Sequence, residues 1–261
     1  MQQCQVGLIK YYKFHSFEGM GLYQAVFTRH GGVSTSPWES LNMGASVGDA
    51  IKCVSQNRQR ALAALEISVD SVYDVYQVHS TKVVVTDRPL QPGEKHLKAD
   101  AILTNKPGVT LMMRFADCVP IFLFDSLNRV IGLVHAGWFG TVNKIVGSTI
   151  KEMHQHFGTK PSDIFAAIGP SIGPDHYSVG DEVIRKAKAG FGDKVDGLFS
   201  NHNGRVYFDL WAANCEILQE SGVNNIEIAE MCTNCNLEDW YSHRGEHGKT
   251  GRFGAIFGIL I

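Results

Sequence analysis

Two neighbouring apolar segments decide the fold: Arg114-Phe-Ala-Asp-Cys-Val-Pro-Ile-Phe-Leu-Phe-Asp125 and Val130-Ile-Gly-Leu-Val-His-Ala-Gly-Trp138. Short apolar runs bounded by turn residues are typical of strands that are buried on both faces. A thiol, Cys118, and an imidazole, His135, stand where these predicted strands stop. Reactive groups at strand ends have a rigid frame behind them, so we expect a functional site to form around this pair.

The rest of the chain alternates between strand-like and helix-like segments. Residues 72–79 alternate in polarity like a strand that delivers His79, and residues 82–86 follow as its predicted partner strand. Residues 141–157 have apolar side chains at helical spacing and predict one amphipathic helix. No repeat, low-complexity tract or break in composition divides the chain, so we expect one α+β domain over residues 1–261, a mixed sheet flanked by helices. Further strands are predicted at 23–28, 99–104, 164–168, 205–209, 226–230 and the C-terminal end, and further helices at 54–65, 179–189 and 210–221.

The composition bounds the possible partners. With 24 Lys and Arg against 26 Asp and Glu, the net charge is −2, which favours neither nucleic acid nor an anionic membrane. Small molecules are therefore the expected ligands, and the chain is expected to be a monomer or a weak homo-oligomer. No basic start leads into an apolar core, and no apolar run approaches the about 18 residues of a membrane span, so we expect a cytoplasmic protein.

Three chemically active side chains each stand at the end of a predicted strand: His79, Cys118 and His135. Two imidazoles and a thiolate are donors that Zn²⁺ or copper accepts, and three protein ligands leave a fourth position for water or substrate. The same residues fit a second chemistry, in which Cys118 is a nucleophile, one histidine is its base, and Asp100 or Asp117 orients that base. A third interpretation is an inert core. Spacing alone leaves all three open.

Other side chains are candidates for ligand contacts. Arg29 precedes a Gly-Gly pair whose backbone N–H groups can cradle an anion, although a hairpin turn explains the same residues. Asn42 lies in a Gly-flanked loop, where it can hold a substrate or a local turn, and Arg58 lies on a predicted helix face. The pair Cys232 and Cys235 has half the spacing of a four-ligand zinc motif, so it indicates a metal, a redox pair or two ordinary thiols.

At these residues the chain resembles the laccase-domain or polyphenol-oxidase-like proteins, whose bacterial members are also called peptidoglycan editing factors or purine nucleoside phosphorylases. The resemblance runs in family order from about residue 25 to the C-terminus, and its motifs are specific together although each is weak alone. They are Arg29-His-Gly-Gly-Val-Ser34, Ser40-Leu-Asn-Met-Gly44, Gln77-Val-His79, Ala99-Asp-Ala101, Ala116-Asp-Cys-Val-Pro120, His135-Ala-Gly-Trp138, Ile168-Gly-Pro-Ser-Ile-Gly-Pro174, Cys232-Thr233 and Tyr241-Ser-His-Arg244.

The resemblance implies a single-domain layered α/β/α fold and a metal site of the zinc type, reported also with copper. The family's metal ligands correspond to His79, Cys118 and His135, and its arginine near the pocket corresponds to Arg244. The implied reaction is phosphorolysis of adenosine, inosine and methylthioadenosine, with adenosine deamination by some members. Phosphate would be held by Arg244, and next by Arg29 or Arg58, because a guanidinium forks onto two phosphate oxygens.

Two departures from the family pattern concern the charge of the site. Phe139 stands where the family commonly has Arg, and the loop of residues 244–250 is one residue longer and less basic. Three alternatives stay open. A copper-dependent polyphenol oxidase needs several metal centres, and the sequence offers no second His-rich cluster. An amidase or editing hydrolase on peptidoglycan precursors would use Cys118 as nucleophile, and a binding module would catalyse nothing.

Overall fold

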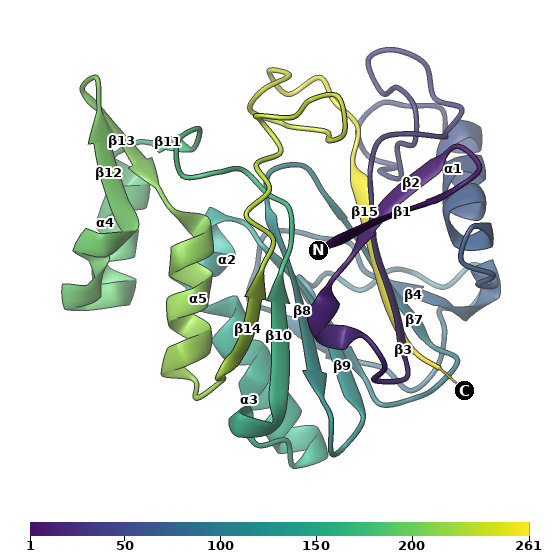
Figure 1. Ribbon diagram of the computed structural model, residues 1–261, viewed down its shortest axis with the longest axis horizontal. Coiled ribbons are helices and arrows are strands. Elements are labelled where there is room, and N and C mark those ends of the chain that lie inside the picture. The colour runs from purple at the N-terminus through teal and green to yellow at the C-terminus, as the bar shows by residue number, and fades with distance from the viewer. Residues whose placement is uncertain (261) are drawn as a thin grey trace.

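The computed structural model describes residues 1–260 and contains two six-stranded sheets that pack face to face (Figure 1). The first sheet has the strand order β1-β2-β3-β15-β7-β4. Its neighbours are antiparallel except for the pair β4 and β7, so the sheet is mixed. The bounds are β1 (Gln2–Val6), β2 (Ile9–Lys13), β3 (Leu22–Phe27), β4 (Val72–Asp74), β7 (Thr110–Phe115) and β15 (Phe253–Ile259).

The second sheet has the strand order β14-β10-β8-β9-β6-β5. It contains residues 119–125 and 130–136 of the two apolar segments that decide the fold, whereas Arg114 and Phe115 belong to β7 of the first sheet. Its edge pairs, β14 with β10 and β5 with β6, are parallel, and its central pairs are antiparallel. The bounds are β5 (Val83–Val85), β6 (Ala101–Thr104), β8 (Val119–Asp125), β9 (Val130–Ala136), β10 (Ile164–Ile168) and β14 (Asn225–Ile228).

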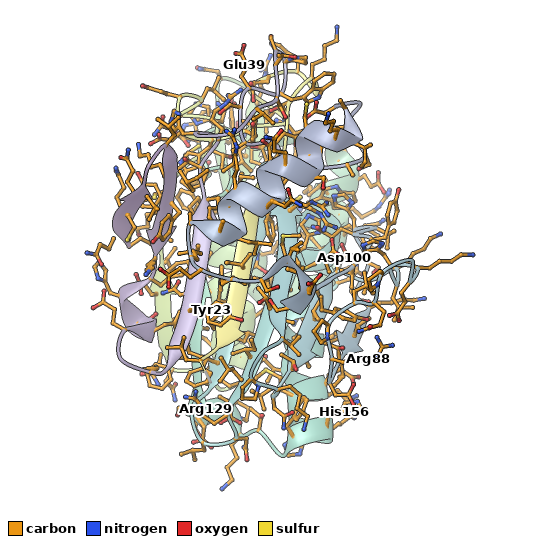
Figure 2. All side chains as sticks on the ribbon, turned by 90° about the vertical axis from the view of Figure 1, so that its right-hand side faces the viewer. Tyr23, Glu39, Arg88, Asp100, Arg129 and His156 are labelled. Atoms are coloured by element: carbon orange, nitrogen blue, oxygen red, sulfur yellow. The ribbon has the colours of Figure 1, made fainter. Side chains whose placement is uncertain are left out.

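Helices cover the outer faces of both sheets, which gives four layers. One helix, α1 (Ile51–Ala63), crosses the outer face of the first sheet in front of β3 and β15, as Figure 2 shows. The other helices lie on the outer side of the second sheet (Figure 1), and a small sheet of order β11-β13-β12 extends beyond them. The bounds are α2 (Trp138–Val142), α3 (Ile145–Phe157), α4 (Asp181–Phe191), α5 (Leu210–Glu220), β11 (Ser178–Val179), β12 (Phe199–His202) and β13 (Arg205–Phe208).

Alternation along the strands explains the layers, because successive side chains of a strand point to opposite faces. In β8, Ile121 packs toward the helices, whereas Phe122 packs into the core between the sheets. In β7, Met113 faces that same core and Met112 faces α1. Both faces of each sheet are therefore apolar, as the continuous apolar runs indicate.

The expected class, a mixed α/β single-domain fold with helices flanking mixed strands, is confirmed. The strands are divided between two sheets, which apolar runs alone do not reveal, since a strand buried by a helix and one buried by a second sheet have the same pattern. The expected bounds of this domain, residues 1–261, stay a prediction. Among the described residues, no helix is long and apolar enough to cross a membrane.

Two local expectations are wrong, and one pair of strands was not expected. The strand predicted over residues 72–79 ends at Asp74, and residues 82–86 do not pair with it, because β5 joins β6 in the other sheet. The helix predicted over residues 141–157 is two helices, since Lys144 has a left-handed φ of 56° between α2 and α3. The polar N-terminal residues form a hairpin, β1 and β2, which their sequence does not predict.

Candidate metal centre and substrate cleft

The structure brings His79, Cys118 and His135 together at one edge of the second sheet. One donor atom from each side chain lies within 4.8 Å of the other two, and Cys118 Sγ lies 3.7 Å from His79 Nε2. Sulfur and nitrogen ligands of a tetrahedral zinc ion are separated by about 3.6 Å, from bond lengths of about 2.3 and 2.05 Å. The donor set and its spacing therefore fit a zinc-type ion, with His79 at the exposed side and His135 at the buried side.

Antiparallel pairing explains how residues far apart in sequence meet. Cys118 directly precedes β8, and His135 is the penultimate residue of β9. Because Pro120 pairs with His135, the start of β8 and the end of β9 lie at the same edge. Gly137 completes this edge, since a Cβ there would lie 2.9 Å from Cys118 Sγ and 3.0 Å from His79 Cδ2. Only a residue without a side chain lets the turn pass this close to both candidate ligands.

Asp100 orients two members of the trio from inside the molecule. Its carboxylate is fully buried, and Figure 2 labels it well inside the outline. Oδ1 accepts a hydrogen bond from His135 Nδ1 at 2.9 Å and one from the backbone N–H of His79 at 3.0 Å. A carboxylate on one ring nitrogen fixes the tautomer that presents the other nitrogen, Nε2, to a metal. The hydrogen bonds from the His79 segment also hold that residue at its unusual left-handed φ of 56°.

Cys118 and His135 titrate as a pair. Burial raises the pKa of Cys118, but the charges and hydrogen bonds of His135 and His79 outweigh burial and bring the pKa to about 6. Burial lowers the pKa of His135, whereas Cys118 and Asp100 raise it, to about 9. Cys118 is therefore a thiolate at neutral pH, which is the form of cysteine that binds metals and attacks electrophiles.

The trio lines a cleft of about 670 Å³, large enough for a nucleoside-sized molecule. One wall of the cleft carries an arginine cluster, Arg58, Arg114 and Arg252. Arg58 Nη1 lies 3.6 Å from Asp74 Oδ2, Arg114 donates to the same carboxylate, and His96 Nε2 lies 2.7 Å from Oδ1. Burial and the neighbouring Arg114 lower the pKa of Arg58 to about 10, so the guanidinium is still charged at neutral pH.

The residues predicted to hold substrate lie in different places. Arg58 and Arg244 line the cleft, the latter with Nη1 3.0 Å from the carbonyl oxygen of Ser178. Arg29 is not among the residues that line it, because its guanidinium donates to Leu237 and Glu246 and lies on the ring of Tyr241. The structure therefore does not show the expected anion cradle at Arg29.

Asn42 also lies outside the lining of the cleft, and it supports the cleft from behind. Its fully buried side chain accepts the backbone N–H of Gly44 at 2.9 Å and that of Arg252 at 2.8 Å. Its amide nitrogen donates to Asp49 Oδ2 at 2.8 Å. Asn42 thus fixes the backbone at Arg252 and does not itself face the cleft where a ligand would bind.

Sequence reasoning missed four members of the charged wall, namely Arg114, Arg252, Asp74 and His96. Arg114 carried a usable signal, because it is the one charged residue of the apolar strand β7. Phe139, where the family commonly has Arg, lies edge-on to Trp138 with the ammonium of Lys186 4.8 Å from its ring centre. A positive charge therefore stands close to the position where the family pattern has its arginine.

These observations define a class: a four-layer α/β protein with a His/Cys/His donor trio at the floor of an arginine-lined cleft. The chain belongs to the family described as multi-copper polyphenol oxidoreductase laccase, whose pattern matches residues 23–260.

Named relatives cover nearly the whole chain. A purine nucleoside phosphorylase of Deinococcus radiodurans is 37% identical over 236 residues, covering 90% of this chain and 88% of the relative. The purine nucleoside phosphorylase YlmD of Bacillus subtilis is 38% identical over 242 residues, covering 89% of this chain and 86% of the relative. The crystal structure of YlmD from Geobacillus stearothermophilus superposes with a TM-score of 0.92 at 32% identity, covering 99% of this chain and 98% of that one.

The family description and the names of the relatives point to different chemistry. A multi-copper oxidase needs several copper centres, most of them rich in histidine. Within residues 1–260, the structure groups metal-type donors at two places, the trio and a set made of Asp175, His176, Cys232 and Cys235. The second group contains a single histidine, so the chain has donors for metal binding but not the histidines of a multi-copper cluster.

Proposed function

We propose that this protein is a zinc-dependent purine nucleoside phosphorylase that acts on adenosine, inosine and methylthioadenosine. The observation that carries the proposal is the composition of the cleft: four arginines and two aspartates line it, together with the donor trio at its floor. A surplus of guanidinium groups suits an anion such as phosphate, since each can donate two parallel hydrogen bonds to it. The names of the relatives support the same reaction.

His79, Cys118 and His135 would hold the zinc ion, which when bound supplies a Lewis acid at the floor of the cleft. Asp100 keeps the proton of His135 on Nδ1, so that Nε2 faces the ion. In phosphorolysis, a phosphate oxygen forms a bond to the anomeric carbon of the ribose while the bond from that carbon to the purine breaks and the base takes a proton. Arg58 and Arg114 line the cleft and would hold the phosphate and neutralise its charge as it approaches the ribose.

Arg244 would contribute to the binding of the purine. Its guanidinium lies 5.1 Å from the ring centre of Tyr177, and both residues line the cleft. A flat aromatic ring backed by a guanidinium is a surface on which a purine can stack. We include adenosine deamination as a second activity of the same cleft, because the trio leaves a coordination position for a molecule other than phosphate.

The test is to incubate the zinc-loaded protein with each nucleoside in the presence and absence of inorganic phosphate. We expect release of the free base and of the sugar 1-phosphate only when phosphate is present, and loss of this reaction in Cys118→Ala. The matched control is Cys53→Ala, a half-buried thiol on α1 that does not line the cleft. Conversion of adenosine to inosine without phosphate would measure deamination.

Three results would count against the proposal. Release of base that does not depend on phosphate excludes a phosphorylase. An activity that survives chelation of zinc but is lost in Cys118→Ser supports the amidase alternative, in which the thiolate of Cys118 attacks a carbonyl. Oxygen consumption with a phenol that requires copper would support the oxidase alternative.

A further inference from the structure

A second group of metal-type donors lies at the rim of the cleft and has no part in the reaction described above. This rim cluster consists of Asp175, His176, Cys232 and Cys235, whose donor atoms all lie within 4.8 Å of one another. The first two residues belong to the loop between β10 and β11, and the two cysteines belong to the long loop between β14 and β15. The cluster therefore joins two loops that are far apart in sequence.

The sulfur–nitrogen distances within the rim cluster match those of a zinc site. His176 Nδ1 lies 3.5 Å from Cys235 Sγ and 3.8 Å from Cys232 Sγ. Sulfur and nitrogen ligands at the corners of a zinc tetrahedron are separated by about 3.6 Å. Asp175 Oδ1 lies 2.9 Å from the same ring nitrogen, at hydrogen-bond distance, and is the fourth donor atom of the group. Two thiolates, an imidazole and a carboxylate form a complete, closed set for zinc, whereas the trio is an open one.

The backbone around the rim cluster is built to hold the cysteines in place. Cys232 forms a β-bridge with Ser171, and the backbone N–H of Thr233 donates to the carbonyl oxygen of Ser171 at 3.0 Å. The backbone N–H of Gly173 donates to Cys232 Sγ at 3.1 Å, the kind of contact that stabilises a thiolate ligand. A Cβ at Gly173 would lie 3.1 Å from the same sulfur, so the close approach of the two loops depends on this glycine.

We propose that Asp175, His176, Cys232 and Cys235 form a second, structural zinc site that fastens the loop after β14 to the loop after β10. The proposal is independent of the reaction that the cleft catalyses. Its consequence is local: the two fastened loops carry Tyr177 and Arg244, which line the cleft. Zinc at the rim would therefore fix the position of that part of the cleft wall.

Zinc content per chain is the direct test, measured on protein purified with a thiol reductant, loaded with zinc and dialysed. We expect two zinc ions per chain, one for each donor group. Cys118→Ala should keep one, the double variant Cys232→Ser with Cys235→Ser should keep one, and the combination of all three should keep none. The control Cys53→Ser should keep both.

Cobalt substitution assigns the ligands independently, because charge-transfer absorption from sulfur to cobalt grows with the number of coordinating thiolates. The rim cluster offers two thiolates and the trio one, so the Cys118→Ala variant should retain the larger part of the absorption. Trypsin adds a structural measurement: cleavage after Arg244 or Lys249 should be faster in the Cys232→Ser, Cys235→Ser variant than in the wild type.

The proposal fails if the double variant at Cys232 and Cys235 binds as much zinc as the wild type. It also fails if the reduced, zinc-loaded protein holds a single zinc ion that Cys118→Ala removes. Recovery of a disulfide-linked peptide between Cys232 and Cys235 from protein alkylated under zinc-loaded conditions would likewise overturn it, since a disulfide has no thiolate to offer. Because zinc content and proteolysis do not depend on turnover, failure here is distinguishable from failure of the proposed reaction.

Discussion

Replacing Asp100 by Asn tests whether the buried carboxylate prepares the trio for metal binding. The carboxylate accepts hydrogen bonds on both oxygens: Oδ1 from His135 and His79, and Oδ2 from the backbone N–H groups of Val78 and Ser80. An amide cannot accept on both sides. If the NH₂ group of the new asparagine faces His135, the imidazole must accept on Nδ1 and carry its proton on Nε2, the nitrogen that faces the metal. If the NH₂ group instead faces Ser80, it meets the backbone N–H of Ser80, and two hydrogen-bond donors face each other.

The size of the effect follows from this change of partner. Removing the carboxylate that orients a histidine ligand costs about 10–100-fold in metal affinity. This corresponds to about 1.4–2.8 kcal/mol, because each tenfold change is about 1.4 kcal/mol. We expect the dissociation constant for zinc at the trio to rise by this factor in Asp100→Asn, measured by competition with a chromophoric chelator in a background that lacks Cys232 and Cys235.

The matched control is Asp125→Asn, at the opposite end of β8. Asp125 is equally buried and accepts backbone N–H groups, from Leu127 at 2.9 Å and Asn128 at 3.0 Å. Both variants should lower the free energy of unfolding, but only Asp100→Asn should weaken zinc binding. Unchanged zinc affinity in a folded Asp100→Asn protein, or an equal loss in both variants, would refute the orienting role.

Three further predictions concern the cleft. In steady-state kinetics, Arg58→Gln should raise the KM for phosphate by about 10–100-fold, because the loss of one hydrogen bond to a charged group costs about 1.5–3 kcal/mol. The KM for nucleoside should change little, and the control Arg29→Gln should leave both KM values unchanged. Gly137→Ala should lower zinc content at the trio, because its Cβ would lie 2.9 Å from Cys118 Sγ, and equilibrium dialysis measures this. Burial raises the pKa of Asp74, but His96, Arg114 and Arg58 outweigh it and the pKa falls below 3.8. The stabilisation from the Asp74 carboxylate is therefore complete above pH 3.8 and is lost as the pH falls through its lower pKa in the folded state. Between pH 6 and pH 3, the free energy of unfolding in urea should therefore fall less in Asp74→Asn than in the wild type.

Part of the site is a local consequence of the sequence. A four-residue turn joins β8 to β9, so the antiparallel register that buries both strands also places Cys118 beside His135. That pair follows from the two apolar segments and the turn between them. His79 is different, because it follows β4 of the other sheet, and a hydrogen bond from its backbone N–H to Asp100 helps to hold it beside Cys118 and His135.

The arginine cluster is not visible in the sequence for a physical reason. Arg58 comes from α1, Arg114 from β7, and Arg252 immediately precedes β15, so the three meet only because β15 inserts between β3 and β7. Pairing between strands more than 100 residues apart leaves no local pattern. The motif around Arg29 is misleading for the same reason, since Glu246, its ion-pair partner, lies on a loop at the other end of the chain.

One buried carboxylate connects the two donor groups. Asp117 directly precedes Cys118, and it accepts hydrogen bonds at 2.7 Å from Thr233 Oγ1, at 2.7 Å from Ser242 Oγ, and at 2.6 Å from the backbone N–H of Arg244. Thr233 lies between the two cysteines of the rim cluster, so the loop that carries them is anchored next to a candidate ligand of the trio. The rim cluster and Asp117, which lies next to the trio, therefore both hold the same loop, the one between β14 and β15. Substitutions within residues 233–244 should change the shape of the cleft wall while the trio, held from behind by Asp100, keeps its geometry.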